Sequence, residues 1–216
     1  MKKREFSVFN ITFIAMMAAM IYVVTLFRFP LLGSKVHFAN AVCLLSGILL
    51  GPLQGGLAAG IGSAFYDAVT GYDLVNVLIT FVSKFAMAWV CGRMLESNVH
   101  AGGKGRIDRT ALACVCGALT YVILYMLKTF IYQKFVYSFP MDAVWATMLS
   151  KLIPSLINAA VAVVAAPLFY HAVLPALRAS GLLPPFFFAF FYTGLGGALT
   201  FAGLQFIGFG LIHWAD

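Results

Sequence analysis

Long apolar segments, separated by short polar or glycine- and proline-rich breaks, run through this chain from end to end. The pattern predicts helices near residues 9–29, 38–50, 53–70, 75–96, 110–136 and 144–177, and a further apolar run covers 185–214. One membrane span needs about 20 apolar residues. We therefore expect an all-α, polytopic membrane helix bundle with six core transmembrane helices and a seventh C-terminal helix.

The breaks between these segments indicate how the chain is organised. The sequence GPLQGG at 51–56 separates the short second segment from the third, and glycine with proline is typical of a tight turn, so these two segments should form a compact hairpin. Pro184 and Pro185 precede the last apolar run. We expect a six-helix membrane domain over residues 1–177 and a C-terminal apolar extension over 178–216.

Composition supports the membrane assignment. Hydrophobic residues make up 62% of the 216 positions and charged residues only 10%, and the mean hydropathy is +0.97, so we expect no separate soluble domain. The net charge of +7 comes from basic residues scattered among predicted loops, which argues against a nucleic-acid partner. Their excess in alternate loops predicts a cytoplasmic N-terminus, with the lipid bilayer as the surroundings.

Four cysteines, Cys43, Cys91, Cys114 and Cys116, fall inside the apolar segments without the spacing of metal ligands. We interpret them as small core residues, and we expect neither a metal nor a cofactor.

Ionisable residues interrupt the most apolar part of the chain. Asp67 and Lys84 lie within the stretch 44–84, and such groups inside a membrane usually face a protein interior or a ligand. Two predicted helices also carry polar residues at helical spacing. With a cytoplasmic N-terminus these groups converge in the outer half of the membrane, which predicts a substrate site made of Asp67, Tyr72, Asn76, Thr80, Lys84, Lys151, Ser155 and Asn158.

Structural explanations of the same residues stay open. Asp67 and Lys84 can pair with each other across neighbouring helices and lock the bundle. Lys151 can extend to the outer interface. Tyr137 and Trp145 can anchor the helices at the membrane surface, where aromatic residues are enriched.

Small residues recur four apart on two segments. Ala15 and Ala19 on the first segment form a face that lets another helix approach closely, and Gly56 with Gly60 on the third repeats the pattern. We expect the glycine pair to pack within the bundle.

The first helix with its alanine face, the segment LLSGILLGPLQGGLAAGIGSAFYDAVTGY and the following NVLITFVSKFAMAWVCGRM together resemble the substrate-binding S component of energy-coupling factor (ECF) vitamin transporters. The resemblance covers residues 8–177. Its most specific part is the GP-x-x-G turn followed by Asp67, Gly71, Tyr72 and Lys84, which is closest to the subgroup associated with riboflavin and related ring-containing vitamins.

This resemblance implies a six-helix bundle in a prokaryotic cell membrane that binds one vitamin near the outer surface, beneath a lid formed by the loop after the first helix. It also implies that Ala15, Ala18 and Ala19 contact a membrane-embedded scaffold subunit, which couples the chain to two cytoplasmic ATPase subunits. The chain has no Walker motif and is not expected to be the motor.

Two other functions remain as alternatives. A stand-alone, proton-coupled secondary transporter of a small polar metabolite would use Asp67 as the coupling carboxylate. An intramembrane enzyme would need Ser63 with His171 or His213, but the sequence Gly60-Ile61-Gly62-Ser63 lacks the glycine that follows the serine in a nucleophile elbow. We expect the chain not to be an enzyme.

Overall fold

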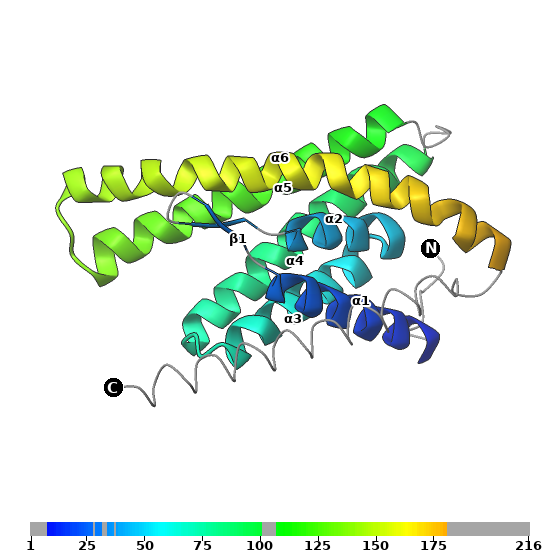
Figure 1. Ribbon diagram of the computed structural model, residues 1–216, viewed down its shortest axis with the longest axis horizontal. Coiled ribbons are helices and arrows are strands. Elements are labelled where there is room, and N and C mark those ends of the chain that lie inside the picture. The colour runs from blue at the N-terminus through cyan, green and yellow to red at the C-terminus, as the bar shows by residue number, and fades with distance from the viewer. Residues whose placement is uncertain (1–7, 28, 32–33, 37, 101–106, 181–216) are drawn as a thin grey trace. The chain divides into compact units, whose positions relative to one another are not determined.

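The structure is a computed structural model that describes residues 8–27, 29–31, 34–36, 38–100 and 107–180. The chain divides into two compact units, residues 1–171 and 172–216, and the site described below belongs to the first. The elements in chain order (Figure 1) are α1 (Val8–Leu26), β1 (Phe29–Leu31), β2 (Ser34–Val36), α2 (Ala39–Leu50), α3 (Pro52–Val69), α4 (Leu74–His100), α5 (Ile107–Ile131), the π-helical turn η1 (Tyr132–Val136) and α6 (Met141–Ser180).

All six predicted core helices are present, and the fold is a helical bundle. Among the described residues, three helices are long and apolar enough to cross a membrane, within Leu74–Leu95, Arg109–Val136 and Met141–Ala172, while Asn10–Leu26 and Ala39–Leu50 are shorter apolar helices. The run 185–214 and the basic N-terminal residues lie outside the described part of the chain. The seventh helix, the domain boundary at 177 and the cytoplasmic N-terminus therefore stay predictions.

A short β-hairpin follows α1, where the sequence pattern predicted helix as far as residue 29. Phe29 pairs with Val36 in an antiparallel register, and the helix ends at Leu26. Pro30 explains the early end, because proline has no backbone N–H and its ring disfavours helical geometry in the residue before it.

The turn between α2 and α3 agrees with the predicted hairpin. Gly51 has a φ of 80°, in the left-handed region that glycine adopts without strain, and its N–H donates to the Gly47 carbonyl at 3.1 Å. Pro52 then occupies the first turn of α3, where its missing N–H removes no helical hydrogen bond.

Helix α3 packs against α1, α2 and α4. Its contact with α1 is so close that a Cβ added at Gly62 would lie 2.3 Å from the Ala18 carbonyl oxygen. Ala18 is buried, with 7% of its surface exposed, and its contact with a scaffold subunit stays a prediction. Ala15 is exposed and Ala19 is half-buried, and their contact with a partner stays a prediction.

The glycine pair on α3 packs inside the bundle, as predicted. Gly56 lies against the ring of Phe85 and Gly60 against the ring of Phe81, both on α4. A Cβ at either glycine would approach ring carbons to 2.9 Å. Glycine thus lets two aromatic side chains lie between the helices.

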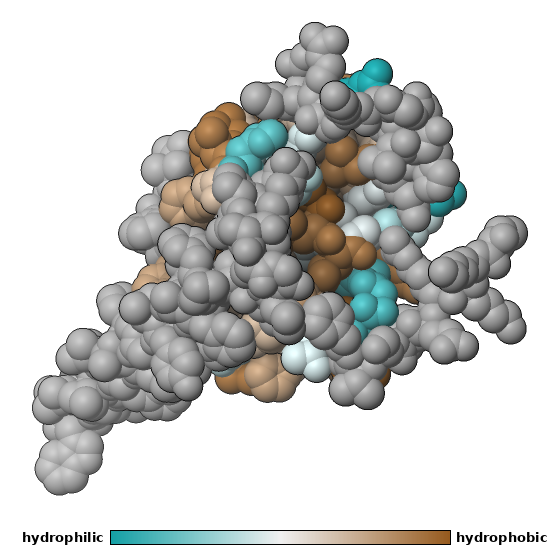
Figure 2. Space-filling view, turned by 90° about the vertical axis from the view of Figure 1, so that its right-hand side faces the viewer, coloured by the Kyte–Doolittle hydropathy of each residue, from teal (hydrophilic) through white to brown (hydrophobic). Residues whose placement is uncertain are grey.

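Large apolar side chains also cover the outer faces of the bundle, and hydrophobic residues dominate much of the described surface in Figure 2. A soluble protein rarely exposes so many together, whereas lipid tails match such a surface. On the three longest helices these exposed residues include Leu74, Leu78, Val82, Ile123, Leu127, Ile131, Leu149, Ile153 and Leu156.

Candidate functional site

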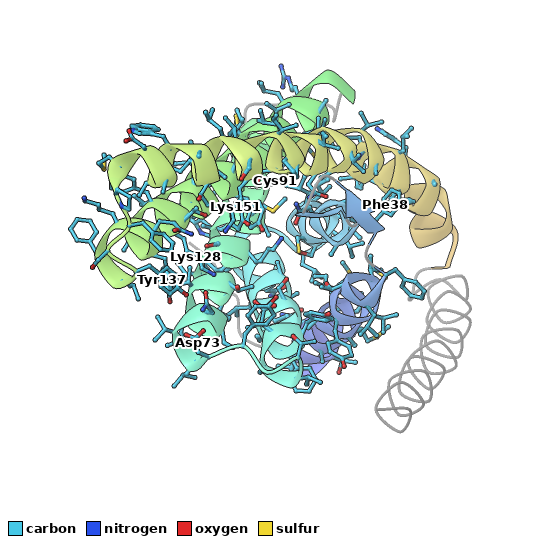
Figure 3. The ribbon with its side chains drawn as sticks, turned by 60° about the vertical axis from the view of Figure 1, so that its left-hand side comes forward. Phe38, Asp73, Cys91, Lys128, Tyr137 and Lys151 are labelled. Atoms are coloured by element: carbon cyan, nitrogen blue, oxygen red, sulfur yellow. The ribbon has the colours of Figure 1, made fainter. Side chains whose placement is uncertain are left out.

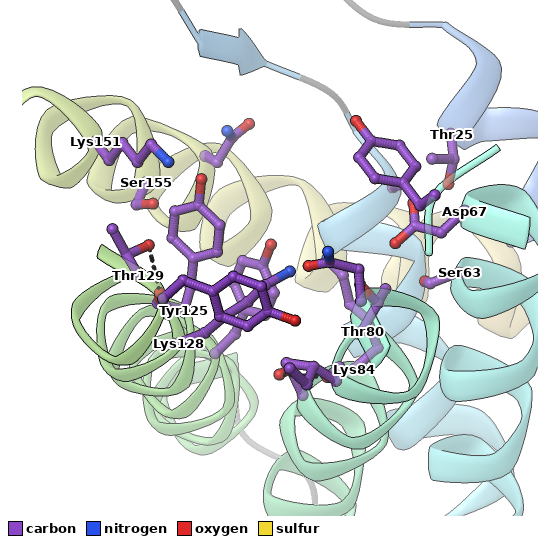
Figure 4. A pocket seen from close by; sticks show the side chains of 18 of the residues that line it. Thr25, Ser63, Asp67, Thr80, Lys84, Tyr125, Lys128, Thr129, Lys151 and Ser155 are labelled. Atoms are coloured by element: carbon purple, nitrogen blue, oxygen red, sulfur yellow. Dashed lines mark hydrogen bonds between the residues drawn. The ribbon is translucent and has the colours of Figure 1, made fainter. Parts of the chain in front are cut away.

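A polar cavity of about 470 Å³ lies inside this apolar bundle, between α3, α4, α5 and α6 (Figure 4). The structure brings all eight residues of the predicted site to its wall, from three different helices and the turn after α3. They are Asp67, Tyr72, Asn76, Thr80, Lys84, Lys151, Ser155 and Asn158. The polar faces of α4 and α6 therefore line the same cavity, as predicted from their helical spacing.

Lys84 is the most deeply buried charge in this wall, with 5% of its surface exposed. Its ammonium group donates a hydrogen bond to Oδ1 of Asn40, which is buried on α2. The same group lies 3.9 Å from the ring centroid of Tyr121 on α5. Lys84 of α4 therefore connects its helix to α2 through the Asn40 amide and to α5 through the Tyr121 ring. Within the described ranges the structure shows these two contacts of Lys84 and no direct pairing with Asp67.

The turn from α3 to α4 positions Asp67 and Tyr72. The Asp67 carbonyl accepts a hydrogen bond from the Tyr72 N–H at 3.0 Å, and Gly71 has a positive φ of 81°. This geometry closes α3 and sends the chain back into the bundle within a few residues. The Asp67 side chain is half-buried and lines the cavity beside Ser63 (Figure 4).

Asp73 caps the start of α4. Its Oδ2 accepts a hydrogen bond from the Asn76 backbone N–H at 3.2 Å, and its Oδ1 accepts one from the Asn76 side-chain amide. These hydrogen bonds lower the pKa of the Asp73 carboxyl below its usual value. The Asn76 side-chain nitrogen is thus engaged within its own helix turn, which leaves its carbonyl oxygen as the group to offer the cavity.

Helix α5 and the first residue of η1 contribute a part of the wall that the sequence analysis missed. Tyr121, Tyr125, Lys128 and Tyr132 follow one another at intervals of four, three and four residues, so they share one helix face, and all four line the cavity. The rings of Tyr121 and Tyr125 are stacked, with centroids 6.0 Å apart and an interplanar angle of 19°. The spacing is present in the sequence, but tyrosine is also common at membrane interfaces, so these residues do not stand out as a site.

The π-helical turn η1 sets the end of that wall. The Tyr137 N–H donates to the Tyr132 carbonyl at 2.9 Å, a bond that spans five residues, and the Phe139 N–H donates to the Gln133 carbonyl at 3.0 Å. Tyr132, Gln133 and Tyr137 all line the cavity, so Tyr137, predicted as a membrane anchor, also belongs to the site wall. The buried Oε1 of Gln133 has no hydrogen-bond donor among the described residues.

The remaining wall comes from the first three helices. Thr25 of α1, Ala39 of α2 and Ser63 of α3 line the cavity. The Ser63 hydroxyl lies 3.8 Å from the Cys43 sulfur. His171, the partner that an intramembrane hydrolase would need, is not in the cavity wall, and His213 lies outside the described residues.

Potential metal ligands are scattered in the described part of the chain. No group of three or more histidine, cysteine or acidic side chains comes together there, and Cys43, Cys91, Cys114 and Cys116 are free thiols. The chemistry of the cavity is therefore that of hydroxyls, amides, ammonium groups and one carboxylate, which suits binding of a polar organic molecule.

Comparisons with known proteins agree with this architecture. A solved structure described as the S component of a bacterial ECF transporter matches 78% of this chain and 97% of its own length, with a TM-score of 0.61 and 15% sequence identity, which indicates a shared fold. An uncharacterized protein in a gap 3′ region of Pyrococcus woesei is 31% identical over 103 residues, which are 47% of this chain and 64% of that relative's length. The model of the family described as ECF-type riboflavin transporter, S component, matches residues 5–174, and the chain therefore belongs to this family.

Proposed function

We propose that this chain is the substrate-binding membrane component of an ATP-driven ECF-type importer, and that it captures a riboflavin-like ring compound from the extracellular side. The family is one of transporter components, not of enzymes. The observation that carries the proposal is a cavity lined by hydroxyl, amide and charged side chains within the apolar bundle of the described residues. Its volume of about 470 Å³ falls within the range of small-molecule sites, about 300–1,000 Å³.

The cavity offers both kinds of contact that a heterocyclic vitamin needs. Tyr121 and Tyr125 present stacked rings on α5, and aromatic surfaces of this kind hold planar ring systems by offset stacking. Asn158 and Thr80 supply hydrogen-bonding groups from the facing helices. Lys84, fixed by Asn40, provides a donor whose position is set before the ligand arrives, which reduces the ordering cost of binding.

Partners follow from the same proposal. The chain would deliver its ligand through a membrane-embedded scaffold subunit that is coupled to two cytoplasmic ATPase subunits, and the exposed Ala15 on α1 remains a candidate contact for the scaffold. Uptake should therefore stop when the ATPase subunits are removed. Uptake that persists without them and follows the proton gradient would instead favour a secondary transporter that uses Asp67.

Ligand binding by the purified full-length chain in detergent tests the proposed site directly. We expect saturable quenching of flavin fluorescence by one equivalent of protein, and each of Lys84→Ala and Asn158→Ala should weaken binding at least about tenfold, the scale of one lost hydrogen bond to a charged or buried group. Lys134→Ala, outside the cavity wall, serves as the matched control. If Lys84→Ala and Asn158→Ala both leave tight binding intact, the site is misplaced.

A further inference from the structure

The charges in the cavity wall do not balance. Three ammonium groups, those of Lys84, Lys128 and Lys151, face the cavity together with one carboxylate, that of Asp67, which leaves a surplus of two positive charges. Charges inside a membrane protein are costly unless a counter-charge or hydrogen-bonding groups compensate them. A ligand that brings negative charge would supply what the protein itself lacks.

The uncompensated positive charge lies on Lys128 and Lys151. Lys84 is already held by Asn40 and by the ring of Tyr121. Lys128 of α5 lies 5.8 Å from the ring centroid of Tyr132, and neither Lys128 nor Lys151 forms an ion pair with a carboxylate in the part of the chain that the structure describes. Both lysines line the same cavity, where their like charges repel each other.

The acidic groups near these lysines do not balance their charge, because Asp67 is the one carboxylate in the wall beside three lysines. Asp67 and Asp73 both attract Lys128, but the Asp73 carboxylate already accepts two hydrogen bonds from Asn76 and is not part of the cavity wall. In Figure 4, Asp67 lies on the α3 side of the cavity, opposite Lys151 of α6. Lys128 and Lys151 thus come from α5 and α6, and Asp67 can balance the charge of only one lysine of the wall.

The wall formed by α5 and α6 also carries neutral donors and aromatic surface. Ser155 lies one helical turn beyond Lys151 on α6 and is buried, with 6% of its surface exposed. Figure 3 shows Lys128, Lys151 and Tyr137 on the same side of the bundle, and Tyr125 extends the wall toward the middle of the cavity. This part of the wall can therefore surround an oxyanion with two ammonium groups and a hydroxyl, next to rings that hold a planar group.

We propose that the cavity selects a ring compound that carries an anionic group, a phosphate or a carboxylate, and that this group binds between Lys128 and Lys151. The inference rests on the proposed function of the cavity and names the class of its ligand. Hydrogen bonds between ionised partners are shorter and stronger than those between neutral ones. A neutral ligand in the same place leaves the ammonium surplus uncompensated, so the anionic compound binds more tightly.

The test compares three flavins that share one ring system: riboflavin, riboflavin 5′-phosphate, and a flavin with a carboxymethyl group in place of the ribityl chain. Each flavin is titrated into the purified full-length chain in detergent. For each protein variant, the Kd of neutral riboflavin is then divided by the Kd of each anionic flavin. We expect a ratio of at least about ten for the wild-type chain, the scale of one charge-assisted hydrogen bond.

Matched variants connect that ratio to the two lysines. In the Lys128→Met/Lys151→Met double variant the ratio should fall to about one, whatever happens to the absolute affinity. Lys134→Met carries the same substitution at a lysine on η1 outside the cavity wall and should keep the wild-type ratio. Equal affinities in the wild-type chain, or a ratio that the double variant leaves unchanged, would overturn the inference. The preferred anionic flavin identifies phosphate or carboxylate as the recognised group.

Inorganic phosphate separates failure of this inference from failure of the proposed function. If no flavin binds, the riboflavin-type proposal falls, and thermal unfolding then decides the anion site. Phosphate, compared with chloride at equal ionic strength, should raise the unfolding temperature of the wild-type chain and of Lys134→Met but not of the double variant. The same shift in all three proteins would refute the anion site as well.

Discussion

The hydrogen bond between Lys84 and Asn40 makes a prediction about stability that does not depend on any ligand. Asn40 has 1% of its surface exposed and Lys84 5%, so each group loses a buried hydrogen-bond partner when the other is removed. The substitution Asn40→Leu keeps the approximate volume of the side chain but removes the oxygen that accepts from the ammonium group. Lys84→Met removes the charge and keeps most of the chain length.

The expected magnitude comes from combining the two substitutions. A buried charge that loses its partner destabilises a protein by about 3–5 kcal/mol, and Tyr121, 3.9 Å away, retains part of the stabilisation through its ring. We therefore expect Asn40→Leu to lower the free energy of unfolding by about 3 kcal/mol in the wild-type chain. In the Lys84→Met background no charge is left unpaired, and the same change should cost about 1 kcal/mol or less.

Denaturant unfolding in detergent micelles, followed by circular dichroism, measures this difference of about 2 kcal/mol between the two backgrounds. Asn40→Leu combined with Lys134→Met provides the control, because Lys134 is not among the residues that line the cavity, and these two changes should be additive. If Asn40→Leu costs the same in the wild-type and Lys84→Met chains to within about 0.5 kcal/mol, the buried pair does not have the role that we assign to it.

Two further predictions concern the close helix contact and the unpaired amide. Gly62→Ala should lower the free energy of unfolding by about 3 kcal/mol, the upper range for overpacking, because its Cβ would meet the backbone oxygen of Ala18. Gly60→Ala should lower it less, because the neighbouring Phe81 ring can shift. Denaturant unfolding that gives the larger loss for Gly60→Ala would contradict this reasoning. Gln133→Leu should weaken flavin binding about tenfold without lowering the free energy of unfolding, because the buried Oε1 of Gln133 has no hydrogen-bond donor among the described residues. A loss of stability with unchanged flavin affinity would show that Gln133 serves packing instead.

Much of the fold could be predicted because membrane helices combine length with uniform hydropathy. The six helices follow directly from the apolar runs, and the turn at Gly51 and Pro52 follows from local backbone preferences. The β-hairpin was missed because strands of three residues, Phe29–Leu31 and Ser34–Val36, are too short for an alternating pattern to be recognised.

The site was predictable where polar residues repeat on an apolar helix. Lys151, Ser155 and Asn158 stand out at helical spacing, and the structure places all three in the cavity wall. The stripe on α5 was overlooked because tyrosine is common both at membrane interfaces and in ligand sites. Asn40 had no periodic companion on its short helix, so the partner of Lys84 was sought among acidic residues instead.

The π-helical turn at Tyr132–Val136 has a consequence for how this pocket can change over evolutionary time. A π-turn holds one residue more than the α-helical turn it replaces, so a single insertion or deletion there rotates everything downstream by about 100° while the preceding turns keep their positions. Tyr137 would leave the rim and another side chain would take its place. Ligand preference can thus be changed by the insertion or deletion of one codon, while α1 to α5 keep their positions.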